Sequence, residues 1–202
     1  MQIPIAIIKQ FFPEFSETML DQLGYFCELV YAKNEVLNLI SRKDIGRIVE
    51  AHLLPSLAIC KQDCFEPGMD ILDIGTGGGF PGIPLAIAMP QIRFTLIDSV
   101  GKKIRAVEEF IKKIKLEHVT CIHSRVEHLD QRYQYITGRA VAPLPEFYNW
   151  AKQKLKPNGK IFYLTGGDIY GAKNRVVVDL FELYGRRFCE TKKLIIFSPS
   201  QH

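Results

Sequence analysis

The stretch DIGTGGGFPGIP at residues 73–84 constrains the fold more than any other part of the chain, because it holds five glycines and two prolines directly after an apolar run. Glycine lets a turn reach positive φ and lets a ligand approach the main chain without a Cβ in the way. Pro81 and Pro84 fit the opening turn of a helix, where a missing N–H costs little. The stretch therefore predicts a strand, a bare loop that holds a ligand, and a helix.

Signals for strands and helices alternate after residue 66. Runs rich in β-branched and aromatic residues, which are typical of strands, recur at residues 69–74, 92–97, 118–123, 134–142 and 160–165. The segment between two of these runs, at 101–116, has the periodicity of an amphipathic helix. This alternation predicts an α/β fold whose parallel sheet is covered by helices on both faces. Two candidate strands near the C-terminus, 186–190 and 193–198, are expected to pair as an antiparallel edge hairpin.

The first 66 residues show helical periodicity and no alternation of strands with helices. Apolar residues recur at helical spacing between residues 16 and 37 and predict an amphipathic helix. Ser41 and Asp44 resemble a capping box that opens a second helix, which Pro55 bends or ends. We therefore expect a helical extension at residues 1–66 and an α/β domain with a parallel sheet at residues 67–202.

The charge is distributed unevenly along the chain. Residues 1–99 hold 7 Lys/Arg and 12 Asp/Glu, whereas residues 100–202 hold 19 and 10. A basic half is typical of proteins with a polyanionic partner, and it is also what solvated helix faces produce. Both interpretations are compatible with the charge alone.

The N-terminal residues lack the basic leader, the continuous apolar core and the cleavage site of a secretory signal. No later apolar run approaches the roughly 20 residues of a membrane span. We therefore expect a cytoplasmic protein without a membrane anchor. Five cysteines without a Cys-x-x-Cys pair argue against a disulfide framework and a zinc knuckle, so we expect no metal.

Two nucleoside ligands use such a glycine loop, a dinucleotide and S-adenosylmethionine. Gly77, Gly79 and Gly82 match the dinucleotide pattern G-x-G-x-x-G, but a single match of this kind is weak. A match that begins at Gly75 puts Phe80 where the third glycine should be. A bulky ring there would obstruct the pyrophosphate approach that a dinucleotide site needs.

Two carboxylates help to decide between a dinucleotide and S-adenosylmethionine. Asp98 ends the second strand, where it can accept hydrogen bonds from both ribose hydroxyls of either nucleoside. Asp73 lies inside the apolar first strand, which is costly unless it caps loop amides or approaches a cation. A sulfonium fits such a neighbour and a pyrophosphate does not, so the carboxylates favour S-adenosylmethionine.

Tyr148 and Lys152 support a third possibility, a nicotinamide-dependent reductase. Their spacing matches the Tyr-x-x-x-Lys of short-chain dehydrogenases, in which the tyrosine is the acid. The glycine pattern of that family, however, needs glycine where Pro81 stands. We interpret the pair as a coincidental helix face.

The segments DIGTGGGFPGIPLAIAMP, LIDSVGKKIRAVEEF, HSRVEHL and GRAVAPL, in this order after NLIS and HLLPS, resemble the bacterial 16S rRNA guanine-N7 methyltransferase family, also called glucose-inhibited division protein B. The resemblance covers residues 25 to 167. It implies a Rossmann-like class I methyltransferase with a mostly parallel seven-stranded sheet and an N-terminal helical extension. It also implies methyl transfer from S-adenosylmethionine to a guanine in the decoding region of 16S rRNA.

The resemblance carries the cofactor contacts to specific positions. Gly75 and Phe80 in the loop, Val126 and Glu127 after the third strand, and Arg139 at the fourth match the positions of the family. Arg139 could position the guanine or the carboxylate of the cofactor. Gly77 and Asp98 join this set from the analysis of the loop and the second strand.

The proposed chemistry needs no general base, because guanine N7 has an in-plane lone pair and no proton. We therefore assign no catalytic acid or base and expect alignment and electrostatics to supply the acceleration. The expected partner is 16S rRNA or the small ribosomal subunit, bound by a monomer. The candidate phosphate contacts are Lys102, Lys103, Arg105 and Arg125.

Three positions depart from the pattern of this family. It usually has Lys-Gly after the fifth strand, where this chain has Thr165 before glycine. It usually has Arg-His and Asp-Ser in the second helix, where this chain has Ala51 and Pro55. These departures leave open an alternative, an rRNA-binding module that keeps the fold and has impaired catalysis.

Overall fold

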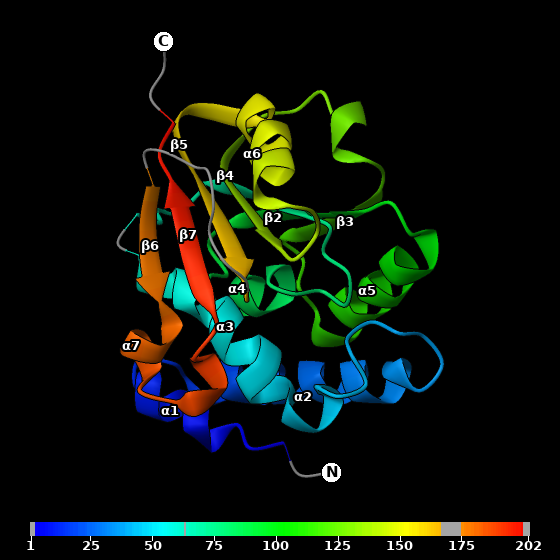
Figure 1. The fold of residues 1–202 in the computed structure, drawn as a ribbon. Helices are drawn as coiled ribbons and strands as arrows, with labels where there is room; N and C mark the ends of the chain where they lie inside the picture. Colours follow the sequence, from blue (N-terminus) through cyan, green and yellow to red (C-terminus); the bar gives the residue numbers. More distant parts are fainter. Residues whose placement is uncertain (1–2, 63, 167–174, 200–202) are drawn as a thin grey trace.

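A seven-stranded sheet in the order β3-β2-β1-β4-β5-β7-β6 organises the computed structural model, which describes residues 3–62, 64–166 and 175–199 (Figure 1). The first five strands are parallel and β7 is antiparallel to both of its neighbours. The predicted α/β class and the mostly parallel sheet are therefore confirmed. The strands are β1 (Asp70–Ile74), β2 (Arg93–Asp98), β3 (Val119–His123), β4 (Tyr133–Arg139), β5 (Leu155–Thr165), β6 (Arg175–Asp179) and β7 (Lys193–Phe197).

The strands send alternate side chains to two apolar layers. Phe162 and Leu164 of β5 join the layer under α4 (Gly82–Ala88) and α5 (Gly101–Ile114). Ile161 and Tyr163 join the opposite layer, which α6 (Leu144–Gln153) covers. Both faces of the sheet are thus buried, as a parallel sheet requires.

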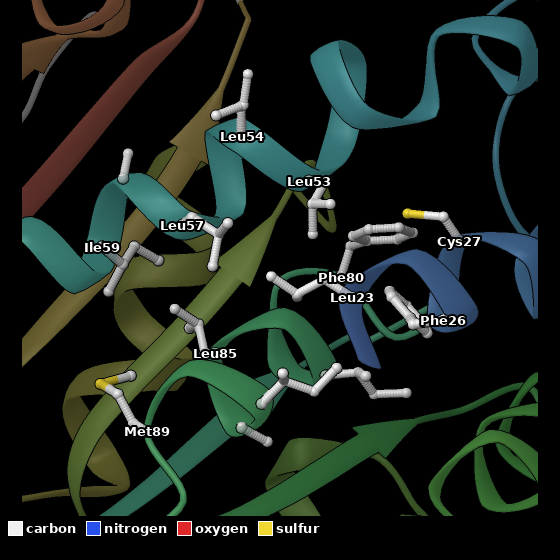
Figure 2. Packing of buried hydrophobic residues seen from close by; sticks show 14 of the residues in the cluster. Leu23, Phe26, Cys27, Leu53, Leu54, Leu57, Ile59, Phe80, Leu85 and Met89 are labelled. Atoms are coloured by element: carbon white, nitrogen blue, oxygen red, sulfur yellow. The ribbon is translucent and has the colours of Figure 1, made fainter. Parts of the chain in front are cut away.

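The N-terminal helices α1 (Ala6–Phe11) and α2 (Glu17–Asn34) pack onto the same layer as α4 and α5. The side chain of Ser16 accepts a hydrogen bond from the backbone of Met19, so the predicted helix begins at a regular N-cap. Lys33 Nζ lies 2.6 Å from Glu109 Oε2 on α5. Figure 2 shows side chains of α2 beside Phe80 of the glycine loop. The extension and the sheet share one apolar cluster, and the boundary at residue 66 stays a prediction.

The second helical segment differs from its prediction. It winds as η1 (Ile45–Arg47), η2 (Val49–Leu53), α3 (Leu54–Leu57) and η3 (Ala58–Lys61). The Ser41 hydroxyl accepts from the backbone of Lys43, and Asp44 forms an ion pair with Arg47, so these two residues make no capping box. Pro55 lies in the first turn of α3, where its missing N–H is tolerated, and the segment continues past it.

The C-terminal hairpin also differs from its prediction. Residues 187–189 form the short helix η5 (Arg187–Cys189), and the strand that pairs with β7 is β6. The connection Thr191-Lys192 lacks the Gly, Asn or Asp of a two-residue hairpin turn, whereas three valines at 176–178 favour a strand. The helix α7 (Leu180–Tyr184) follows β6, and the Tyr184 hydroxyl donates to the carbonyl of Leu54 at 2.8 Å. No helix within the described ranges has the length and apolarity to cross a membrane.

Gly138 of β4 provides a test of this packing. A Cβ at Gly138 would lie 2.4 Å from Cε2 of the buried Phe147 on α6. We predict that Gly138→Ala lowers the free energy of unfolding by about 1–3 kcal/mol, because the ring of Phe147 must shift although it is fully buried and packs 4.4 Å from the ring of Tyr163. Urea unfolding monitored by circular dichroism measures the change.

The matched control is Gly46→Ala on η1, because a Cβ there meets nothing within 4 Å. Its unfolding midpoint should stay close to that of the wild type. Equal midpoints for both variants would mean that α6 does not press on β4 at this position.

Candidate functional site

A cavity of about 460 Å³ lies where β1, β2 and β4 end. The strand order changes direction between β1 and β4, and open α/β sheets bind ligands at such a point. The glycine loop, the end of β2, the short helix η4 (Val126–His128) and the residues after β4 line the cavity. Leu39 from the N-terminal extension also reaches it.

The structure brings the seven predicted cofactor positions together around this one cavity. Two of the four candidate phosphate contacts, Lys103 and Arg125, also line it. The other two, Lys102 and Arg105, are exposed on α5 outside its lining. The analysis of the sequence assigned no role to several lining residues. Leu39, Ser99 and Ser124 lie within segments that carry the family resemblance, whereas Trp150 lies in none of them. The seven predicted positions are Gly75, Gly77, Phe80, Asp98, Val126, Glu127 and Arg139.

Most of the loop glycines serve the packing of the protein itself. A Cβ at Gly75 would lie 2.2 Å from Cγ2 of Val141, and a Cβ at Gly82 would lie 2.3 Å from Cδ2 of Leu96. At Gly77 the nearest atom would be 3.8 Å away. The sequence interpretation that the bare loop exists to admit a ligand therefore suits Gly77 best, whereas the other glycines let the loop pack closely against its neighbours.

Asp98 holds the glycine loop against β2. Its Oδ2 accepts a hydrogen bond from the backbone N–H of Gly77 at 3.0 Å, and its Oδ1 accepts one from Val100 at 2.8 Å. Each carboxylate oxygen has a second acceptor position. Because Asp98 lines the cavity, these positions are available to hydroxyl groups of a bound nucleoside.

Asp73 is fully buried below the loop. Its Oδ2 accepts from the backbone N–H of Gly82 at 3.1 Å, and its Oδ1 accepts from the Thr137 hydroxyl at 2.9 Å. Burial raises the pKa of this carboxyl to about 6, against the effect of its hydrogen bonds. Of the two roles expected for Asp73, the structure shows the capping of a loop amide, and Asp73 is absent from the cavity lining. It therefore does not help to choose between the two nucleosides.

Arg139 is fixed by groups that lie far from it in the sequence. Its guanidinium lies 5.1 Å from the ring centroid of Phe80, a cation–π contact, and Nη1 donates to Nδ1 of His52. Burial lowers the pKa of His52 to about 2, helped by the charges of Arg139 and Lys192, so this imidazole is neutral. Its proton lies on Nε2, because Nδ1 is the acceptor, and Nε2 is 3.5 Å from Asp44 Oδ2. Burial lowers the pKa of Arg139 to about 10, which leaves it cationic at neutral pH.

The Tyr148 and Lys152 pair has no role in this cavity. The ring of Tyr148 packs against Phe197 at 4.7 Å, and Lys152 Nζ lies 5.8 Å from the centroid of Tyr148. Neither side chain is part of the lining. The structure therefore supports the interpretation of this pair as a coincidental helix face.

The family model described as rRNA small subunit methyltransferase G (GidB) matches residues 19–173 of this chain. The chain belongs to the rRNA small subunit methyltransferase G family. A relative of that name from Christiangramia forsetii is 41% identical over 209 residues, which cover 98% of each chain. Another from Bacteroides thetaiotaomicron is 39% identical over 95% of this chain and 98% of the relative.

Solved structures with distant sequences share the fold of this GidB-family chain. A putative S-adenosyl-L-methionine-dependent methyltransferase from Methanococcus maripaludis has a TM-score of 0.55 at 13% identity, covering 79% of this chain and 92% of its own. A precorrin-6Y C5,15-methyltransferase from Geobacter metallireducens has a TM-score of 0.50 at 14% identity, covering 81% and 91%. The architecture is that of the class I methyltransferases.

The neutral state of His52 predicts a pH dependence of stability. The folded-state pKa of about 2 lies below the ordinary value of 6.5, so the unfolded state binds the proton more readily and stability falls as the pH drops below 6.5. Between pH 7 and pH 5 the wild type should lose about 2 kcal/mol of unfolding free energy relative to His52→Gln.

Urea titrations of both proteins at several pH values measure this difference. Asp73 acts in the opposite direction, because its folded-state pKa is raised to about 6 and its contribution fades as the pH rises through that value. Asp73 is present in both proteins, so its effect cancels in the comparison. Parallel pH profiles would show that His52 is not buried in the neutral form.

Proposed function

We propose that this protein transfers the methyl group of S-adenosylmethionine to N7 of a guanine in the decoding region of 16S rRNA. The observation that carries the proposal is the ligand-sized cavity at the β1/β4 switch point, with Asp98 at its edge, in a chain of the rRNA small subunit methyltransferase G family. The names of the curated relatives support the class of RNA.

The residues of the cavity fit the cofactor. Its volume of about 460 Å³ lies within the range of small-molecule sites, roughly 300–1,000 Å³. Asp98 has free acceptor positions for the ribose hydroxyls, and the apolar side chains of Ile97 and Val126 offer a surface to the adenine. The cationic Arg139 at the opposite side suits the carboxylate of the cofactor or the acceptor base.

The cofactor, when bound, supplies a methyl group on a positively charged sulfur. Guanine N7 attacks through its lone pair, so the chain has no proton to remove, and neutral His52 and cationic Arg139 are not needed as acid or base. Asp98 and the loop backbone orient the donor. Alignment of two held reactants is a large source of acceleration.

A group of basic side chains next to the cavity is the candidate RNA-binding surface. Lys103 and Arg125 stand at the cavity edge, and Lys102 and Arg105 continue this basic face on α5. We propose that they bind phosphates around the target nucleotide. We also propose that the enzyme acts as a cytoplasmic monomer, because all seven predicted cofactor positions meet around one cavity within a single chain.

The reaction itself is the first test. Small ribosomal subunits that lack the modification are incubated with the protein and methyl-labelled S-adenosylmethionine, and borohydride–aniline cleavage maps N7-methylguanine in the 16S rRNA. We expect one labelled guanine. RNA binding without any transfer would overturn the proposal and favour the rRNA-binding module.

Asp98→Ala tests the cofactor site. We predict that this variant binds S-adenosylhomocysteine more than tenfold more weakly, a loss of about 1.4 kcal/mol or more, because the ribose loses an acceptor and the Gly77 amide loses its partner. Isothermal titration calorimetry measures the affinity. The control is Asp130→Ala, an exposed carboxylate outside the lining, which should bind like the wild type.

A further inference from the structure

A second cavity of about 260 Å³ lies on the other side of Arg139. Arg139 and Ala140, at the end of β4, line both cavities, so the cavities adjoin there. The second cavity is bounded by the carboxyl end of β5, by the residues before β7 and by the helical segment at 51–55. These elements meet there because β7 is antiparallel and starts at the edge where β4 and β5 end.

We propose that this second cavity holds the target base, flipped out of the RNA and presented to the methyl group where the two cavities adjoin at Arg139 and Ala140. The proposal rests on the methyltransferase function proposed above and adds to it the place of the acceptor. Reacting atoms must approach to about 3–3.5 Å, so the acceptor site has to adjoin the cofactor site. This cavity shares Arg139 and Ala140 with the first, whereas the hollow at residues 38–42 shares only Leu39 with it.

The walls suit a flat aromatic ring. Leu164, Leu180 and Pro55 supply apolar surface, as in other sites that bind an extruded base. The volume of about 260 Å³ leaves room for a single base between these walls.

The polar groups of the cavity favour guanine. Lys192 Nζ donates to the carbonyls of Ala51 at 3.0 Å and Glu50 at 3.3 Å. An ammonium has three donors, so one remains for a ligand. Lysine and arginine are the usual partners of the O6 and N7 edge of guanine. A donor to O6 from Lys192 or Arg139 leaves N7 free for the methyl group, whereas adenine would present an amino donor to the same cation.

The three departures from the pattern of the family, at Ala51, Pro55 and Thr165, all line this second cavity. Thr165 pairs with Lys193 in the sheet register, so Lys192 lies next to the position where the family usually has lysine. In this chain Lys192, the residue before β7, supplies a cation to the acceptor pocket beside Arg139. The departures thus change the wall of the pocket and leave the cofactor cavity intact.

A substitution that fills the second cavity tests the proposal. Within the described residues, a Cβ on Gly166 meets only Thr191 Oγ1, at 4.0 Å, and the backbone there is outside the left-handed region, so the side chain introduced by Gly166→Leu can occupy the cavity. We expect methyl transfer to small subunits to fall at least a hundredfold while the affinity for S-adenosylhomocysteine stays within twofold. The control Gly46→Leu should match the wild type. Transfer within threefold of the wild type in Gly166→Leu would overturn the proposal.

The role of the Lys192 ammonium is tested separately. Lys192→Met should lower kcat/KM at least tenfold with unchanged S-adenosylhomocysteine affinity. Thr165→Lys in the Lys192→Met background should restore most of the loss, which a purely structural role of Lys192 would not allow. No loss in Lys192→Met, or no recovery in the double variant, would contradict the role of the cation.

A direct binding measurement separates this proposal from the proposed function. Guanosine 5′-monophosphate is titrated into the S-adenosylhomocysteine complex while the methyl NMR signals of Leu164 and Leu180 are followed. Shifts that disappear in Gly166→Leu support the base pocket even if the wild type methylates another nucleotide or transfers nothing to small subunits. Absence of shifts in the wild type would overturn it, whatever the outcome of the methylation assay.

Discussion

Two carboxylates at the ends of neighbouring parallel strands hold the glycine loop, and the candidate cofactor cavity depends on them. Asp73 of β1 accepts from the amide of Gly82, where α4 begins, and Asp98 of β2 accepts from the amide of Gly77. Parallel register brings both strand ends to the same edge of the sheet. The loop between these two hydrogen bonds is thereby held open over the cavity at Gly77, while its other glycines pack closely against the core.

Arg139 lines both compartments of the site, and the N-terminal extension helps to fix the position of its side chain. Its guanidinium is held by Nδ1 of His52 and by the face of Phe80, whose own ring packs 4.9 Å from Phe26 of α2. Figure 2 shows this layer, in which Phe80 lies between α2 and Leu53. The extension is therefore more than a cover for the sheet, because it supplies His52 to one compartment and Leu39 to the other.

The electrostatics of the site follow from burial. A protonated His52 beside Arg139 and Lys192 would bring three cations together, and burial prevents this by lowering the pKa of the imidazole. The neutral ring can then accept from Arg139, which remains charged. A site with a fixed cation and no general base suits a reaction that moves a methyl group and no proton.

The sequence by itself determined the α/β class, the five parallel strands, the helix α2 and the glycine loop with Asp98, because hydrophobic period and glycine content are local properties of the chain. Only the tertiary structure decided the partner of β7, the course of the chain past Pro55, the capping role of Asp73 and the contact of His52 with Arg139. These features join residues that are as many as 87 positions apart, and no local pattern encodes which of many distant groups will meet. The second cavity belongs to the same class, since its walls come together only when the antiparallel β7 starts beside the ends of β4 and β5.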